Sequence, residues 1–209
     1  MTVIQSAFIC ATSLCFAMSA QAATVFTSKA AFLSTLRPGS YTESFTNPAS
    51  NPNASLPLKT LTSGAFSYTI TGSPGGLYEE GTFIGNWGGA EELVITFTTG
   101  NITAVGGEFY ITNFAGNFQT EPVTVTLSDG TVETWSPASL TTFRGFTSPG
   151  VPITSLTLRA PAASRFNNID NLIVGSAVPE PSCVGLLAGA LVPLMRRKRR
   201  ATLAPPAGS

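Results

Sequence analysis

Two carboxylates occupy positions in the sequence where a specific binding partner is expected. Glu43 alternates with Tyr41 and Phe45, so the three side chains are expected on one face of an extended strand. Asp170 alternates with Leu172 in the same way. A carboxylate on the apolar face of a strand must be paired or ligated, because an unpaired buried charge is very costly.

Oxygen ligands without imidazole or thiolate suit calcium, and two asparagines lie beside the second acid. The predicted ligands of a structural Ca²⁺ are Glu43, Asp170, Asn168 and Asn171. This set resembles the calcium site of carbohydrate-binding jelly rolls, in which an acid near the first strand meets an acid near the last. The alternative is that each acid accepts hydrogen bonds from backbone N–H groups or pairs with Arg165.

The stretch GLYEEGTFIGNWGG, residues 76–89, joins aromatic rings to an amide and to flexible glycines. Such a combination is typical of a sugar-binding surface. The predicted ligand-binding residues are Tyr78, Phe83, Asn86 and Trp87. The alternative is that the tryptophan belongs to the core, as it commonly does in small β-domains.

Composition excludes several kinds of catalysis. The chain has no histidine, which rules out Ser-His-Asp and Cys-His catalysis and imidazole metal sites. Its three cysteines, Cys10, Cys15 and Cys183, lie in the terminal segments, so the central region has neither thiol nor disulfide. Catalysis by carboxylates stays open, in the form of a polysaccharide hydrolase or lyase.

Two pairs of adjacent glutamates, at 79–80 and 91–92, bear on that alternative. Glycosidases need two carboxylates ~5–9 Å apart across a cleft. Adjacent residues on a strand point to opposite faces, so neither pair can act alone as such a duo. We therefore expect these acids to be solvated residues of turns, and the protein not to be an enzyme.

The net charge of zero hides an uneven distribution. Five of the eleven basic residues lie together at 196–200. Residues 23–178 hold six basic and ten acidic side chains, which gives a net charge of about −4. A nucleic-acid partner is not expected, because phosphate binding needs a basic face.

The central region alternates between apolar and polar residues, as half-buried strands do. Clear examples lie at 66–71, 93–98 and 123–128, and Asp129-Gly130 is typical of a hairpin turn. Only 28–36 reads as a helix, with Ser28 as its N-cap and Phe32, Leu33 and Leu36 on one face. The predicted fold is an all-β, antiparallel β-sandwich, jelly-roll-like, over residues 23–177.

The amino-terminal segment 1–22 is predicted to be a secretory signal peptide. It has an apolar stretch at 7–18 and ends in small residues, with cleavage expected after Ala22. The residues that define this cleavage site are Ala20, Ala22 and Ala23.

The carboxyl-terminal segment 178–200 has three parts, a Val-Pro-Glu-Pro-Ser motif, an uncharged stretch at 183–195 and a basic cluster. As a helix the uncharged stretch would span roughly 20 Å, less than the ~30 Å hydrocarbon core of a bilayer. The segment resembles the PEP-CTERM sorting tag of Gram-negative bacteria. The matching residues are Val178, Pro179, Glu180, Pro181, Ser182, Arg196, Arg197, Lys198, Arg199 and Arg200.

The resemblance implies a transient anchor in the inner membrane, recognition by an exosortase, and delivery to the cell surface or extracellular matrix. An ordinary membrane anchor is the alternative, and residues 201–209 form a short tail. The expected function is that of an exported, non-catalytic protein that associates with exopolysaccharide. A structural coat protein without a ligand is a further alternative.

Overall fold

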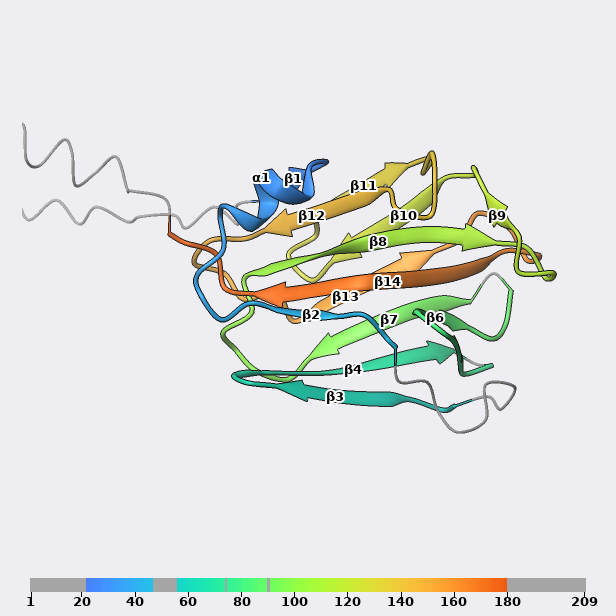
Figure 1. Cartoon of the computed structure of the whole chain (residues 1–209), viewed down its shortest axis with the longest axis horizontal. Helices are drawn as coiled ribbons and strands as arrows, with labels where there is room; N and C mark the ends of the chain where they lie inside the picture. Colours follow the sequence, from blue (N-terminus) through green and yellow to red (C-terminus); the bar gives the residue numbers. More distant parts are fainter. Residues whose placement is uncertain (1–21, 47–55, 74, 90, 180–209) are drawn as a thin grey trace, which may run out of the picture.

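A computed structural model describes residues 22–46, 56–73, 75–89 and 91–179. These residues form two antiparallel sheets packed face to face (Figure 1). We call the eight-stranded sheet the front sheet and the six-stranded one the back sheet. The predicted jelly-roll-like β-sandwich is thereby confirmed.

The front sheet has the order β1-β12-β8-β14-β6-β5, with β2 also paired to β14 and β9 to β8. Its strands are β1 (Thr24–Phe26), β2 (Tyr41–Glu43), β5 (Leu77–Glu80), β6 (Phe83–Asn86), β8 (Ala104–Thr112), β9 (Phe118–Gln119), β12 (Phe143–Thr147) and β14 (Phe166–Gly175).

The back sheet has the order β11-β10-β13-β7-β4-β3. Its strands are β3 (Lys59–Ser63), β4 (Phe66–Ser73), β7 (Glu92–Phe97), β10 (Val123–Leu127), β11 (Val132–Trp135) and β13 (Ser155–Arg159).

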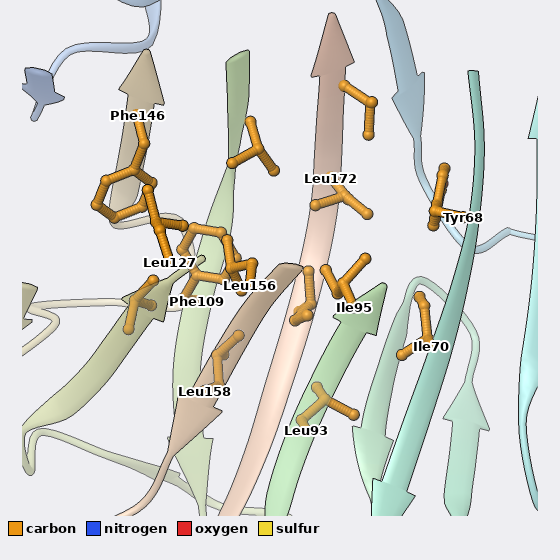
Figure 2. Packing of buried hydrophobic residues seen from close by; sticks show 14 of the residues in the cluster. Tyr68, Ile70, Leu93, Ile95, Phe109, Leu127, Phe146, Leu156, Leu158 and Leu172 are labelled. Carbon is orange, nitrogen blue, oxygen red and sulfur yellow. The ribbon is translucent and has the colours of Figure 1, made fainter. Parts of the chain in front are cut away.

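The core fills the space between the sheets, because the inward strand faces are mostly apolar. Tyr68 and Ile70 of β4 lie beside Leu93 and Ile95 of β7, and all four are fully buried (Figure 2). Full burial of such a side chain contributes about 1.5–3 kcal/mol to stability. The alternation predicted from the sequence is confirmed in these strands.

The hairpin predicted at Asp129-Gly130 joins β10 to β11. The Asp129 carboxylate accepts a hydrogen bond of 2.9 Å from the Thr131 N–H, and Gly130 has a φ of 88°. That φ favours glycine, since it has no Cβ to clash with the backbone.

The one helix of the described residues, α1 (Lys29–Leu33), is shorter than predicted. Ser28 is its N-cap as expected, and its hydroxyl accepts the Ala31 N–H. Phe32 is buried, but Leu33 is 42% exposed, so the predicted apolar face of the helix was wrong in part. The reason is that α1 covers the front sheet through one ring, which lies against Gly106 and Gly145.

The strand β14 contains a bulge that changes which side chains face the core. Its pairing with β8 shifts by one residue between Asp170 and Ile173, and Asn171 has a φ of 48°. As a result Ile169 and Leu172 both face the core although they are three residues apart. The prediction that Asp170 shares a face with Leu172 was wrong, because a regular strand was assumed.

Hydrogen bonds tie both ends of the described chain to the sandwich. The Ala23 N–H donates to the Thr131 hydroxyl at 2.8 Å, and the Val178 N–H donates to the Thr35 carbonyl at 2.8 Å. The predicted signal peptide and most of the sorting segment, with their expected helices, lie outside the described residues. Within the described part, no helix has the length and apolar character of a membrane span.

Candidate functional site

A row of aromatic rings crosses the outer face of the front sheet, the face turned away from the core. Adjacent ring centroids are 6.1 Å apart for Trp87 and Tyr78, 5.8 Å for Tyr78 and Phe83, and 6.0 Å for Phe83 and Tyr110. Phe118 follows at 6.5 Å from Tyr110. We call these five residues the ring row.

The ring row arises from the pairing register of the front sheet. Tyr78 of β5 lies opposite Gly85 of β6, which lies opposite Asn168 of β14, and Asn168 lies opposite Tyr110 of β8. Directly paired residues point to the same face of a sheet. Residues far apart in the sequence therefore meet in one line across four strands.

Tyr78 is held in place by its neighbours in this line. Its hydroxyl donates a 2.6 Å hydrogen bond to the Asn168 side-chain oxygen. Its ring lies over Gly85, where a Cβ would come within 2.7 Å of the ring carbon Cε1. Burial raises the pKa of Tyr78, so the phenol stays protonated and can keep donating to Asn168 at neutral pH.

A pocket of about 490 Å³ opens beside the ring row, a volume in the usual range for small-ligand sites. Two ring pairs line it. Tyr78 and Trp87 come from β5 and from the residue after β6, while Phe114 and Phe166 come from the β8–β9 turn and the start of β14. Among the described residues, Glu80 is the one charged residue of its lining.

Phe114 is 91% exposed, which is unusual for a phenylalanine. Hydrogen bonds to Asn113 hold the turn that carries it. The Asn113 side-chain oxygen accepts hydrogen bonds of 3.0 Å from the N–H groups of Ala115 and Asn117. The Asn113 N–H donates to the Asn117 carbonyl, and the Asn113 carbonyl accepts the Gly116 N–H. The turn thus presents an apolar ring to solvent at the pocket.

Three carboxylates lie beside the rings on the same face. Asp170 is opposite both Phe83 and Glu108 in the sheet register, and Glu80 is opposite Phe83. Burial, with the Glu108 charge adding to it, raises the pKa of Asp170, while the Asn171 N–H and Lys29 oppose that rise. The outer face therefore offers hydrogen-bond acceptors next to apolar rings.

The structure brings three of the four predicted ligand-binding residues together. Tyr78 and Phe83 are partly exposed members of the ring row, and Trp87 is 44% exposed at the pocket. Asn86 is fully buried instead. It faces inward, accepting the Asn167 N–H at 2.6 Å and donating to the Gly88 carbonyl, so it shapes the loop and does not line the pocket.

The four predicted calcium ligands are not brought to one point. Glu43 is paired with Leu172 and faces the core, whereas Asp170 and Asn168 lie on the outer face. The bulge residue Asn171 donates a 3.0 Å hydrogen bond to Glu108 on that outer face. In the described ranges, no three acidic, His or Cys side chains gather as metal ligands would. These residues do not fit a shared calcium ion.

Glu43 has partners of another kind. It accepts a hydrogen bond from the Tyr41 hydroxyl and one of 2.8 Å from the Phe45 N–H. Burial, reinforced by the Glu43 carboxylate, raises the pKa of Tyr41 to about 12. Asp170 likewise accepts the Asn171 N–H at 2.6 Å. The alternative of acids that accept backbone N–H groups is confirmed for both.

Arg165, which the alternative offered as a second candidate partner of these acids, pairs elsewhere. Its Nε donates to Glu121 at 2.9 Å, and its Nη2 contacts the other carboxylate oxygen. This hydrogen bonding lowers the pKa of Glu121. The Arg165–Glu121 pair therefore takes no part in holding Glu43 or Asp170.

The adjacent glutamates of β5 point to opposite faces, as expected for neighbours on a strand, but the expectation of a solvated turn residue was wrong for Glu79, which is buried on that strand. Glu79 is 2% exposed and forms an ion pair with Lys59 of β3, which links the two sheets. Glu80 is exposed and lines the pocket. Glu91 accepts the Gly75 N–H at 2.9 Å, and Glu92 pairs with Arg159 at 3.0 Å. Of these four acids only Glu80 belongs to the pocket.

Sequence reasoning missed four of the seven rings of the aromatic site. Tyr110, Phe118, Phe114 and Phe166 were not singled out, since each lies in a different segment from Tyr78. One signal was present, because Phe109-Tyr110 and Phe114 stand on either side of a turn-forming Asn113. Which of those rings faces outward depends on the strand register, which the sequence did not reveal.

Comparisons with known proteins give distant structural matches alone. No protein-family model matches the chain, and no curated protein sequence matches it. Among solved structures, a carbohydrate-binding module of family 29 aligns with a TM-score of 0.39 and 14% identity, covering 66% of this chain and 90% of that module. A mutant of the module CBM29-2 complexed with mannohexaose aligns with a TM-score of 0.37 and 14% identity, covering 57% of this chain and 92% of the module.

Proposed function

We propose that the β-sandwich is a non-catalytic module that binds polysaccharide on the outer face of its front sheet. The observation that carries the proposal is the pocket at the Trp87–Tyr78 end of the ring row, in which Trp87 and Phe114 are the exposed rings. Sugars have apolar C–H faces that stack on aromatic rings, and hydroxyl groups that need hydrogen-bond partners at their rim. The outer face provides aromatic rings for stacking and carboxylates that accept hydrogen bonds from hydroxyl groups.

The composition of the site favours binding over turnover. Among the described residues, Glu80 is the charged residue of the pocket lining. Asp170 of β14 and Glu108 of β8 lie opposite each other in the sheet register, beside the ring row and outside the pocket. A carboxylate-based glycosidase needs its two acids on either side of a cleft. The described lining of the pocket provides a single acid, Glu80.

Export and sorting complete the proposal. The signal peptide would direct the chain across the inner membrane, and the PEP-CTERM segment would hold it there until an exosortase removes the tail. The module would then reach the cell surface or matrix, where polysaccharide is available. The hydrogen bond from Val178 to Thr35 supports this division, since the fold is tied down up to the first residue of the sorting motif.

A glycan array with the purified protein tests the binding. We expect retention on a subset of polysaccharides, lost in Trp87→Ala and kept in Val132→Ala, a matched control on β11 that is 60% exposed. Release of reducing ends from the retained polysaccharide, lost on Glu80→Gln, would instead establish the hydrolase alternative. An array without any retained glycan would leave the coat protein as the better account.

Sorting is tested by the intact mass of the protein recovered from culture. We expect a mature chain that begins near Ala23 and has lost the basic cluster at 196–200. Recovery of the chain with both terminal segments intact would overturn this part of the proposal.

A further inference from the structure

The geometry of the rings points to the kind of polysaccharide that the site takes. We infer that the pocket binds a single, separated chain between its two ring pairs, and that the site does not dock on the flat face of a crystalline polysaccharide. The inference rests on the proposed function and narrows its substrate class.

The first argument is that the ring row is not flat. Neighbouring rings are tilted by 76° for Trp87 and Tyr78, 89° for Tyr78 and Phe83, and 65° for Phe83 and Tyr110. Edge-to-face packing of this kind is the preferred geometry of aromatic pairs, so it is stable in the folded protein. A crystal face would contact several rings at once only if those rings lay in one plane.

The second argument is that the most exposed rings belong to the pocket. Tyr110, the fourth ring of the row, is 4% exposed and its neighbours Phe83 and Phe118 are partly exposed, whereas Trp87 is 44% and Phe114 is 91% exposed. Phe114 lies outside the ring row and packs on Phe166, with ring centroids 6.2 Å apart. Accessible aromatic surface therefore concentrates where two ring pairs line one hollow.

The third argument is that a carboxylate lines the pocket itself. Glu80 is an exposed residue that lines the hollow, and the Asn113 turn supports Phe114 beside it. A chain inserted between the ring pairs would have its hydroxyl groups beside Glu80. Chains within a crystal have most of these hydroxyl groups bonded to one another, and they cannot enter a hollow singly.

Two substitutions separate a pocket from a platform. Phe114→Ala removes a ring that lines the pocket but lies outside the row, while Phe118→Ala removes a ring of the row that does not line the pocket. If a separated chain binds in the pocket, Phe114→Ala and Trp87→Ala each weaken affinity about tenfold or more, a loss of at least about 1.4 kcal/mol. Phe118→Ala then changes affinity less than about threefold.

The probes are matched soluble and crystalline forms of the same polymer, cellohexaose with microcrystalline cellulose and mannohexaose with crystalline mannan. Affinity is measured by calorimetry for the hexasaccharides and by depletion for the solids, using the full-length protein and its variants. Circular dichroism and urea unfolding confirm that each variant is folded.

We expect binding to at least one hexasaccharide and little depletion by its crystalline form. Strong depletion by a crystalline form, reduced by Phe118→Ala as much as by Trp87→Ala, would overturn the single-chain inference and leave the proposed function standing. Failure to bind any of the four probes, together with an empty glycan array, would overturn both.

Discussion

At the scale of single residues, Gly85 makes room for the ring that anchors the site. A Cβ at this position would lie 2.7 Å from the Tyr78 ring and 2.9 Å from the Asn167 carbonyl oxygen, too close for ordinary contact. The side-chain oxygen of Asn168, which accepts the Tyr78 hydroxyl, is also in its way. The absence of a side chain at Gly85 thus allows Tyr78 to lie across β6.

We predict that Gly85→Ala lowers the free energy of unfolding by about 1–3 kcal/mol, the usual cost of overpacking. It should also weaken polysaccharide binding, because Tyr78 must move. Urea unfolding and calorimetry measure the two effects. Gly100→Ala is the matched control, since no atom lies within 4 Å of a Cβ built there. Equal effects of the two substitutions would show that Tyr78 is not held over Gly85.

The ion pair between Lys59 and Glu79 connects the sheets at a buried position, where the Glu79 side chain is 2% exposed. Lys59 also lies 5.9 Å from the centroid of the Phe45 ring. Removal of one partner from a buried pair is costly because it leaves the other charge without that partner. The pair therefore matters more than its exposed counterparts.

We predict that Lys59→Met destabilises the fold by about 3 kcal/mol. Arg159→Met is the control, since the Arg159–Glu92 pair is 68% and 43% exposed and such surface pairs contribute about 0–1 kcal/mol. Urea denaturation of both variants gives the comparison. A cost for Lys59→Met no larger than for Arg159→Met would contradict the structural role of the buried pair.

At the scale of elements, the bulge of β14 divides the outer face of the front sheet. On one side of the bulge Ile173 packs under α1 with Phe32 and Phe143. On the other side Asp170 and Asn168 lie among the rings. Because of the extra residue in the bulge, β14 contributes side chains both to the part of the outer face that α1 covers and to the part that carries the rings.

Asn171 occupies the bulge with a φ of 48°, a conformation that asparagine and glycine tolerate and β-branched residues do not. We predict that Asn171→Val costs about 1–3 kcal/mol more stability than Asn171→Gly. Both variants lose the hydrogen bond to Glu108, so their difference in thermal or urea unfolding isolates the backbone. Equal stabilities would mean that the bulge is not strained by a branched side chain.

The bulge also shows where prediction from sequence ends. The alternation in β4, β7 and β10 predicted the sandwich correctly, since each strand needs only its own residues to define an inner face. The face of Asp170 was predicted wrongly, because no local signal marks an inserted residue. The ring row could not be assembled either, since it depends on β5, β6, β14 and β8 being neighbours.

At the scale of the whole molecule, the pocket and the carboxyl-terminal end of the fold lie at opposite ends of the sandwich. Phe166 at the start of β14 lines the pocket, and Gly175 ends the strand shortly before Val178. Ten residues of strand span about 30 Å. Figure 1 shows the last described residues at the left and β9, beside the pocket turn, at the right.

A chain held through its carboxyl terminus should therefore keep its pocket accessible. We predict that protein immobilised by a carboxyl-terminal tag binds soluble polysaccharide within about twofold of its affinity in solution. Surface plasmon resonance compared with calorimetry measures this. A loss of binding on immobilisation would mean that the carboxyl-terminal end approaches the pocket.

The central claim is that the exposed ring of Trp87 forms part of a polysaccharide site. Titration calorimetry of the wild type and Trp87→Ala, with a soluble hexasaccharide chosen from the array, tests it most directly. The account predicts about a tenfold or greater loss of affinity in Trp87→Ala, about 1.4 kcal/mol or more, with unchanged urea unfolding. Equal affinities of the two proteins would contradict it.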